Sequence, residues 1–117
     1  MNFSGIPDTT GTDMSGCKYD IGKLRLDLLP FDALEEVGRV LTTGADKYGD
    51  RNWERGMAWS RLLGAALRHL FSWAMRSGRD AESGRSQLAH AATDILFLLA
   101  YEIRGIGEDD RAGSGVG

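Results

Sequence analysis

The sequence has little of what would assign it to a specialised class of protein. Its 117 residues include one cysteine, Cys17, which excludes an internal disulfide framework and suits a reducing compartment. The formal net charge is -3, from 14 Lys and Arg against 17 Asp and Glu, whereas a nonspecific nucleic-acid-binding protein needs a basic surface. The longest apolar run, Ile95 to Tyr101, is about a third of the length that spans a bilayer. We therefore expect one globular domain that binds neither nucleic acid nor a membrane.

The motifs of several enzyme classes are also absent. There is no GxxxxGK[ST] or GxGxxG phosphate-binding loop, and no adjacent His-Asp pair of the kind used by metal phosphohydrolases. Neither CxxC nor HExxH occurs, so a zinc site is not expected. Ser60, Ser83 and Ser86 lack the surroundings of a nucleophilic serine.

The two ends of the chain differ in composition from the middle. Residues 1–16 are rich in Gly, Ser, Thr and Asp, and the last residues are rich in Gly. We predict a flexible arm at 1–16, a domain at 17–105 and a flexible tail at 106–117. The first residues show no basic patch followed by an apolar run, so we expect no targeting segment and a cytoplasmic protein.

Hydrophobic periodicity predicts three helices and no strong strand. The first runs from near Pro30 to about Thr43, or on to Lys47; the second follows Ser60, a candidate N-cap, and ends near Ser77. The third runs from about Ser86 to Ile103 and stops at Gly105. The predicted fold class is therefore all-α, a small helical bundle.

Apolar side chains cover more of these helices than three helices can bury. On the second helix we predict a core stripe of Leu63, Leu67, Leu70, Phe71 and Ala74, with His69 and Trp73 on its flank. The third helix is apolar nearly all round, and we expect it to be buried on most sides. Its one polar stripe is Gln87, His90, Asp94 and Tyr101. We therefore predict a homo-oligomer, either a dimer or a tetramer.

Two sets of carboxylates are candidate metal ligands. Asp32, Glu35 and Glu36 lie on the first helix within little more than one turn, and hard cations such as Mg2+ prefer several oxygen ligands. The same residues also suit the helix dipole and an ion pair with Arg39, so both interpretations stay open. Asp94 is isolated in an apolar helix, where a carboxylate must be paired, neutral or metal-bound. A hydrogen bond to His90 or a pair with an arginine of the second helix is the structural alternative.

Three segments outside these helix faces add further candidates. Residues 80–84 offer Asp80 and Glu82, or else form a turn that caps the third helix. Residues 18–25 carry Lys18, Asp20, Lys23 and Arg25 beside a glycine, which suits a triphosphate or simply a solvated loop. Residues 44–53 carry Lys47, Tyr48, Asn52 and Trp53, which could stack on a base and read its edge, or else form a turn whose aromatic side chains cover the core.

A string of residues across the chain then resembles a known family. The matching residues are Lys18-Tyr19-Asp20, Gly22-Lys23, Arg25, Asp27-Leu28-Leu29-Pro30, Ala33-Leu34, Val37, Arg39-Val40, Gly44-Ala45, Lys47-Tyr48-Gly49, Asn52-Trp53, Gly56, Ser60-Arg61, Ala66, Arg68-His69-Leu70, Trp73, Asp80, Glu82-Ser83-Gly84, Leu88-Ala89-His90-Ala91 and Phe97-Leu98-Leu99. They are similar to the phage dATP/dGTP diphosphohydrolases, a MazZ-like family related to the MazG-like all-α nucleotide pyrophosphatases. The resemblance covers roughly residues 17 to 104.

The resemblance implies an oligomeric enzyme that depends on Mg2+ or Mn2+ and acts on a purine deoxynucleoside triphosphate, dATP or dGTP. Such enzymes cut between the α and β phosphates and release the monophosphate and pyrophosphate. For a phage-encoded protein, the cytoplasm would be that of the host. The competing hypothesis is a non-catalytic helical module that binds nucleotides or another protein.

The resemblance also implies site residues. MazG-like enzymes hold metals with an ExxE pattern on one helix and an ExxD pattern on a later one. Residues 32–35 fit the first pattern with Asp leading, and Asp94 fits the second, but Ala91 stands where its glutamate would be. The implied metal ligands are Asp32, Glu35, Glu36 and Asp94, with Glu82 or His90 in place of the missing glutamate unless the number of metals differs. Glu35 and Asp94 are the expected catalytic residues, one of which would accept the proton of the attacking water.

The expected contacts to the substrate come from the cations, aromatic rings and imidazoles. The substrate-binding candidates are Lys18, Asp20, Lys23, Arg25, Lys47, Tyr48, Asn52, Trp53, His69 and His90. Among them, Lys23, Arg25 and Lys47 would stabilise the leaving pyrophosphate, while Tyr48 and Trp53 would flank the base.

Overall fold

The fold is known from a computed structural model, which describes residues 22–113. The elements are the short 3-10 helix η1 (Leu26–Leu28), α3 (Phe31–Tyr48), the 3-10 helix η2 (Asn52–Arg55), α4 (Trp59–Ala74) and α5 (Gln87–Arg104). Within residues 22–113 the only β structure is an isolated bridge between Ala58 and Glu108, so the predicted all-α class is confirmed. Over the same range, no helix combines the length and apolar character needed to cross a membrane. The predicted arm, Cys17, Lys18 and Asp20 lie outside the described residues.

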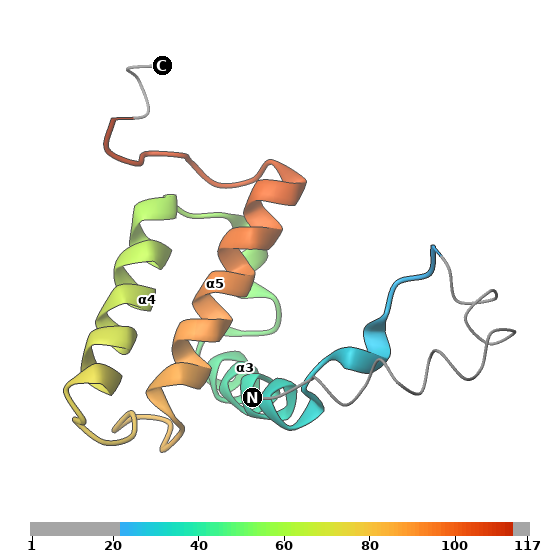
Figure 1. The fold of residues 1–117 in the computed structure, drawn as a ribbon. Coiled ribbons are helices and arrows are strands. Elements are labelled where there is room, and N and C mark those ends of the chain that lie inside the picture. The colour runs from blue at the N-terminus through green and yellow to red at the C-terminus, as the bar shows by residue number, and fades with distance from the viewer. Residues whose placement is uncertain (1–21, 114–117) are drawn as a thin grey trace, which may run out of the picture.

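The long helix α5 is the centre of the arrangement. It runs antiparallel beside α4, and α3, seen nearly end-on, lies beside the first turns of α5 (Figure 1). The turn between α4 and α5 is tied to α3 by two ion pairs, Lys47 to Glu82 at 2.6 Å and Glu36 to Arg85 at 3.6 Å. This turn therefore brings the start of α5 and one side of α3 to the same end of the molecule.

The ends of the helices follow local chemistry, with one exception. Ser86 caps α5, because its side chain accepts a hydrogen bond from the backbone N–H of Leu88, and Gly105 ends the helix in the left-handed conformation. The prediction that Ser60 caps the second helix is wrong, since α4 begins at Trp59. Ser60 instead donates hydrogen bonds from its backbone N–H and its hydroxyl to Asp110. A carboxylate distant in the sequence thus accepts from a backbone N–H of the first turn, which has no partner within the helix.

The core of the described chain is small and lies between α5 and its two neighbours. Its buried apolar residues are Val37, Val40, Leu62, Ala66, Ala89, Ala91 and Tyr101. The predicted core stripe of α4 is wrong, because Leu63, Leu67, Leu70 and Phe71 are exposed while Leu62 and Ala66 face inward. Apolar residues occupy most sides of α4, so their pattern alone does not determine which side packs against α5. In the observed orientation, His69 also contacts a polar side chain of α5, that of Gln87.

Large apolar side chains remain exposed on η1 and on all three α-helices of the single chain. On α5, which was expected to be buried on most sides, Ile95, Leu96, Leu99 and Ile103 are between 44% and 74% exposed. Phe71 on α4 is 67% exposed. Leu24, in the segment that leads into η1, is 84% exposed. The surplus of apolar surface that the sequence predicts is therefore present in the structure.

The segment after α5 is packed against the start of α4. Trp59 donates its indole N–H to the backbone oxygen of Ile106 at 2.9 Å and its backbone N–H to Glu108 at 2.8 Å. Residues 106–110, which were expected to belong to a flexible tail, thus continue the fold across the beginning of α4. Residues 114–117 lie outside the described part.

Candidate functional site

Polar side chains gather where the second half of α4 meets the first half of α5. The imidazoles of His69 and His90 stack with their ring centres 4.7 Å apart and their planes at 19°. On one side, Nδ1 of His69 lies 2.7 Å from Oε1 of the buried Gln87. On the other, Nε2 of His90 lies 2.6 Å from the hydroxyl oxygen of Ser83. We call these four residues, together with Asp80 and Asp94, the histidine cluster.

The turn before α5 is organised by Asp80. Its carboxylate accepts backbone hydrogen bonds from Glu82 and Ser83, as in the capping turn that the sequence offered as an alternative. It also lies 3.5 Å from Nε2 of His90. Burial opposes ionisation of Asp80, but the backbone hydrogen bond from Ser83 and the charge of His90 outweigh it, so its pKa is lowered. The pKa of His90 is also lowered. Burial is the largest cause and the repulsion of His69 adds to it, whereas the attraction of Asp80 acts in the opposite direction.

Asp94 is the unsatisfied member of the histidine cluster. Its Oδ2 is buried and has no hydrogen-bond partner within residues 22–113. Burial raises the pKa of this carboxyl to about 6, although the positive charges of His69 and Arg68 pull it down. The alternative of a hydrogen bond between Asp94 and His90 is not observed, and Nε2 of His90 faces Ser83 and Asp80 instead. A buried carboxylate without a donor is suited to a cation or to a donor group of a ligand.

The acidic face of α3 lies apart from Asp94 in this chain. Glu35 forms an ion pair with Arg39 at 2.7 Å, and Glu36 lies 3.6 Å from both Arg39 and Arg85. Asp32 accepts the backbone N–H of Ala33 at 2.7 Å, close to the start of the helix. Across residues 22–113, no three His, Cys, Asp or Glu side chains form a group that could hold a metal ion. The structure thus shows the helix-dipole and ion-pair roles of these carboxylates, while their role as metal ligands stays a prediction.

Lys47 and Glu82 are brought together from distant parts of the sequence. Their ion pair at 2.6 Å raises the pKa of Lys47 to about 12, with a further contribution from Tyr48. The ring centre of the exposed Tyr48 lies 5.1 Å from the Lys47 ammonium. One cation and one aromatic ring of the predicted substrate contacts are therefore adjacent at the surface.

Trp53 is built into the bundle. Its ring stacks on Phe97 of α5 at 4.5 Å and 12°, and the guanidinium of Arg104 lies 5.1 Å from the ring centre. Its backbone oxygen accepts a hydrogen bond from the hydroxyl of the fully buried Tyr101. This is the alternative in which the aromatic residue of the loop covers the core. Asn52 beside it is half-buried at the start of η2.

The segment around η1 carries Lys23 and Arg25, the other candidate substrate-binding cations within the described residues. Lys23 is exposed, and Arg25 forms a bidentate pair with Asp27 at 2.9 and 3.0 Å. The sequence did not single out Arg68, Ser83 and Gln87 for the site, yet the structure places all three at or beside the histidine cluster. For Gln87 a signal existed, namely a polar residue in the first turn of an apolar helix. For Ser83 and Arg68 the contacts depend on the path of the turn between α4 and α5.

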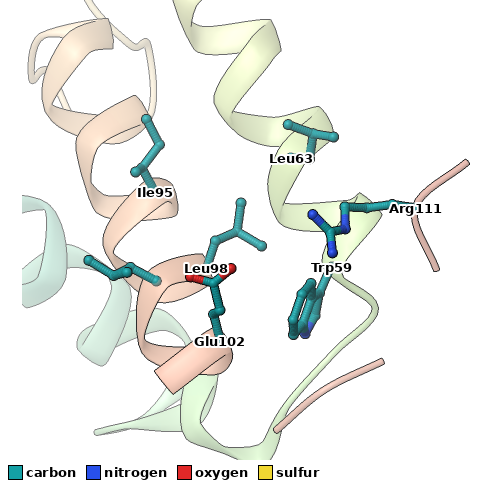
Figure 2. A pocket seen from close by; sticks show the side chains of 7 residues that line it. Trp59, Leu63, Ile95, Leu98, Glu102 and Arg111 are labelled. Carbon is teal, nitrogen blue, oxygen red and sulfur yellow. The ribbon is translucent and has the colours of Figure 1, made fainter. Parts of the chain in front are cut away.

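An apolar hollow lies at the end of the α4–α5 pair opposite the histidine cluster (Figure 2). It has a volume of about 300 Å³ and is lined by Trp59, Leu63, Ile95, Leu98, Leu99, Glu102 and Arg111. The Arg111 guanidinium lies 5.2 Å from the ring centre of Trp59. Apart from Glu102 and Arg111 the lining is apolar.

Comparison with known proteins identifies a family for this chain. The family described as "dATP/dGTP diphosphohydrolase, N-terminal" matches residues 13–111. A protein named dATP/dGTP diphosphohydrolase from Salmonella phage PMBT28 is 41% identical over 86 residues, which are 74% of this chain and 29% of that protein. The chain thus spans less than a third of the length of this relative. No solved structure matches.

Proposed function

The chain belongs to the family of dATP/dGTP diphosphohydrolase N-terminal domains, and we propose that it hydrolyses dATP or dGTP between the α and β phosphates. The products would be the deoxynucleoside monophosphate and pyrophosphate. The name of the 41% identical phage protein supports the substrate class. By the same relationship we propose that the protein acts in the cytoplasm of a phage-infected host.

The observation that carries the proposal is the unpartnered oxygen of Asp94 beside the two imidazoles. A buried carboxyl without a hydrogen bond is unfavourable in a purely structural role. Its oxygen and those of Asp32, Glu35, Glu36 and Glu82 are the hard donors that Mg2+ or Mn2+ prefers. The donor chemistry of these residues therefore suits the expected metal, which when bound would neutralise charge on the phosphate oxygens.

The cations around the cluster suit the triphosphate. Arg68 lies on α4, and its positive charge lowers the pKa of Asp94. Lys47 forms an ion pair with Glu82 in the turn before α5. We propose that Lys23, Arg25 and Lys47 stabilise the leaving pyrophosphate, since cations near a developing negative charge lower the barrier. Lys18 and Asp20 keep their proposed role as substrate contacts on the basis of the family resemblance.

We also propose that the protein forms a dimer or tetramer through its exposed apolar surface. The single chain leaves Phe71 of α4 and Ile95, Leu96 and Leu99 of α5 exposed. Association would remove this surface from water, at roughly 25 cal/mol for each Å² buried.

A panel of nucleoside triphosphates tests the function. The protein is incubated with each of dATP, dGTP, dCTP and dTTP and with Mg2+ or Mn2+, and the products are separated. We expect pyrophosphate and monophosphate, with faster cleavage of the two purine substrates. Release of inorganic phosphate alone would place the cut elsewhere. Tight binding of a purine nucleotide without any product would favour the competing hypothesis of a non-catalytic binding module.

A further inference from the structure

The orientation of the Gln87 side chain determines the tautomer of His69. Nε2 of Gln87 donates a hydrogen bond to the backbone oxygen of Gly78 at 3.2 Å. The reverse orientation would place the amide oxygen against that carbonyl oxygen, so the amide is fixed. Its Oε1 therefore faces Nδ1 of His69 at 2.7 Å. An amide oxygen can only accept, so Nδ1 must carry the proton.

A neutral imidazole with its proton on Nδ1 has a lone pair on Nε2. Nε2 of His69 has no hydrogen-bond partner among the residues that the structure describes, and it is not one of their buried unpartnered atoms. The flat face of the ring is occupied by His90, and Nδ1 is occupied by Gln87. The ring thus has one reactive position left, and it is an acceptor at the same helix contact as the unpartnered oxygen of Asp94.

We infer that Gln87 is a positioning residue that holds His69 as the Nδ1–H tautomer, so that Nε2 of His69 accepts the proton of the attacking water. The second half of this inference rests on the proposed function. One O–H bond of the water breaks, and its proton goes to Nε2. The water oxygen bonds to the α-phosphorus, the bond from that phosphorus to the bridging oxygen breaks, and pyrophosphate leaves with the electron pair.

The tautomer can be observed without any assay of activity. The chain has only two histidines, so a 15N-labelled sample gives four ring-nitrogen signals, which His69→Gln assigns. At mildly alkaline pH we expect His69 to show a protonated Nδ1 and an unprotonated Nε2. In Gln87→Leu we expect this preference to be lost. Wild-type His69 in the Nε2–H form would overturn the inference.

Gln87→Glu is the matched variant for Gln87→Leu. Both remove the donor to Gly78, but only the carboxylate of Glu can still accept from Nδ1 of His69. We expect Gln87→Leu to lower kcat by about tenfold, which is part of the contribution that a general base makes to the rate. Gln87→Glu should recover most of that loss together with the tautomer. Equal loss in both variants, at equal thermal stability, would mean that Gln87 acts only through Gly78.

The role of Nε2 is tested by His69→Gln and by the Mn2+-loaded protein. We expect His69→Gln to slow pyrophosphate release by about a hundredfold, within the range for loss of a general base. A normal rate would overturn the proton-acceptor role. A nitrogen signal in the pulsed electron paramagnetic resonance spectrum of Mn2+ that disappears in His69→Gln would overturn it too, since the lone pair would then bind the metal. If wild-type protein cleaves no nucleotide, the proposed function fails, whereas the NMR result still decides the tautomer.

Discussion

His69 of α4 and His90 of α5 stack with their ring centres 4.7 Å apart, which makes the charge of one imidazole unfavourable for the other. Burial lowers the pKa of His90 most, the attraction of Asp80 acts in the opposite direction, and the repulsion of His69 lowers the pKa further. The net shift favours the neutral form of His90.

The first prediction concerns the titration of His90. We expect its pKa in the folded protein to lie below the ordinary value of 6.5, and His69→Gln to raise it by removing a nearby positive charge. Asp80→Asn should lower it further, since the amide can still accept the turn hydrogen bonds but has no charge. NMR titration of the ring protons measures the pKa of His90 in the wild type and in both variants. A wild-type His90 pKa above 6.5 would show that Asp80 outweighs burial.

The second prediction concerns stability and Asp94. Its folded-state pKa is raised from 3.8 to about 6, so the folded protein binds more protons than the unfolded chain between these values. The contribution of Asp94 to the free energy of unfolding is thus most favourable below pH 3.8 and declines as the pH rises to about 6. Asp94→Asn should therefore be more stable than wild type above pH 6, by about 1 kcal/mol after allowance for solvent screening.

Thermal unfolding at several pH values, without added metal, measures this difference. The advantage of Asp94→Asn should shrink as the pH falls toward 4. An advantage that is independent of pH would mean that the change acts through packing or hydrogen bonding rather than through the buried charge.

The third prediction concerns the carboxylates in the proposed reaction. Glu35→Gln and Asp94→Asn each keep the size of the side chain and remove one negative charge. If both groups hold catalytic metal, each change should slow turnover by about a hundredfold, or on the order of 3 kcal/mol. Chelation of divalent cations should abolish turnover, and adding Mg2+ or Mn2+ should restore it.

Glu108→Gln is the control for these two variants. The side chain of Glu108 is exposed, and the hydrogen bonds to Trp59 and Met57 come from its backbone, so the change should leave both fold and rate intact. Near-normal rates in both Glu35→Gln and Asp94→Asn would restrict these carboxylates to structural roles.

The fourth prediction separates packing from base recognition at Trp53. Because its ring stacks on Phe97 at 4.5 Å, Trp53→Ala should destabilise the protein by about 3 kcal/mol or more. Tyr48→Ala removes an exposed ring and should change the stability by less than about 0.5 kcal/mol. An unchanged melting temperature in Trp53→Ala would contradict the packing role. If the same substitution raised KM more for purine than for pyrimidine substrates, it would support a role of Trp53 beside the base.

The fifth prediction concerns assembly. We expect light scattering at micromolar concentration to give the mass of a dimer or tetramer. Phe71→Glu should lower that mass, because it places a charge on apolar surface that the single chain exposes. Arg61→Glu, at an exposed position of the same helix, is the control. A wild-type mass of 12.8 kDa would show that the exposed surface does not associate at that concentration.

Local chemistry in the sequence was sufficient to predict the helices and several of their ends. The apolar period located α3, α4 and α5, and Ser86 and Gly105 marked the limits of α5, because a serine cap and a left-handed glycine act within a few residues of the chain. The family was likewise visible in residues 17–104, since its motif residues stand at recognisable positions in the sequence. The surplus of apolar side chains could also be counted without coordinates.

The tertiary structure decided which faces meet and which polar groups find partners. Leu62 and Ala66, rather than Leu63 and Leu67, face α5, because a helix that is apolar on most sides can pack in several rotations of similar burial energy. Asp110 reaches Ser60 across 50 residues, and no local signal could have shown this. The contacts of His69 with Gln87 and of His90 with Ser83 depend on the path of the backbone in the turn between α4 and α5. For the same reason Asp94 was left without a donor, and this unsatisfied carboxyl is the feature from which the proposed chemistry starts.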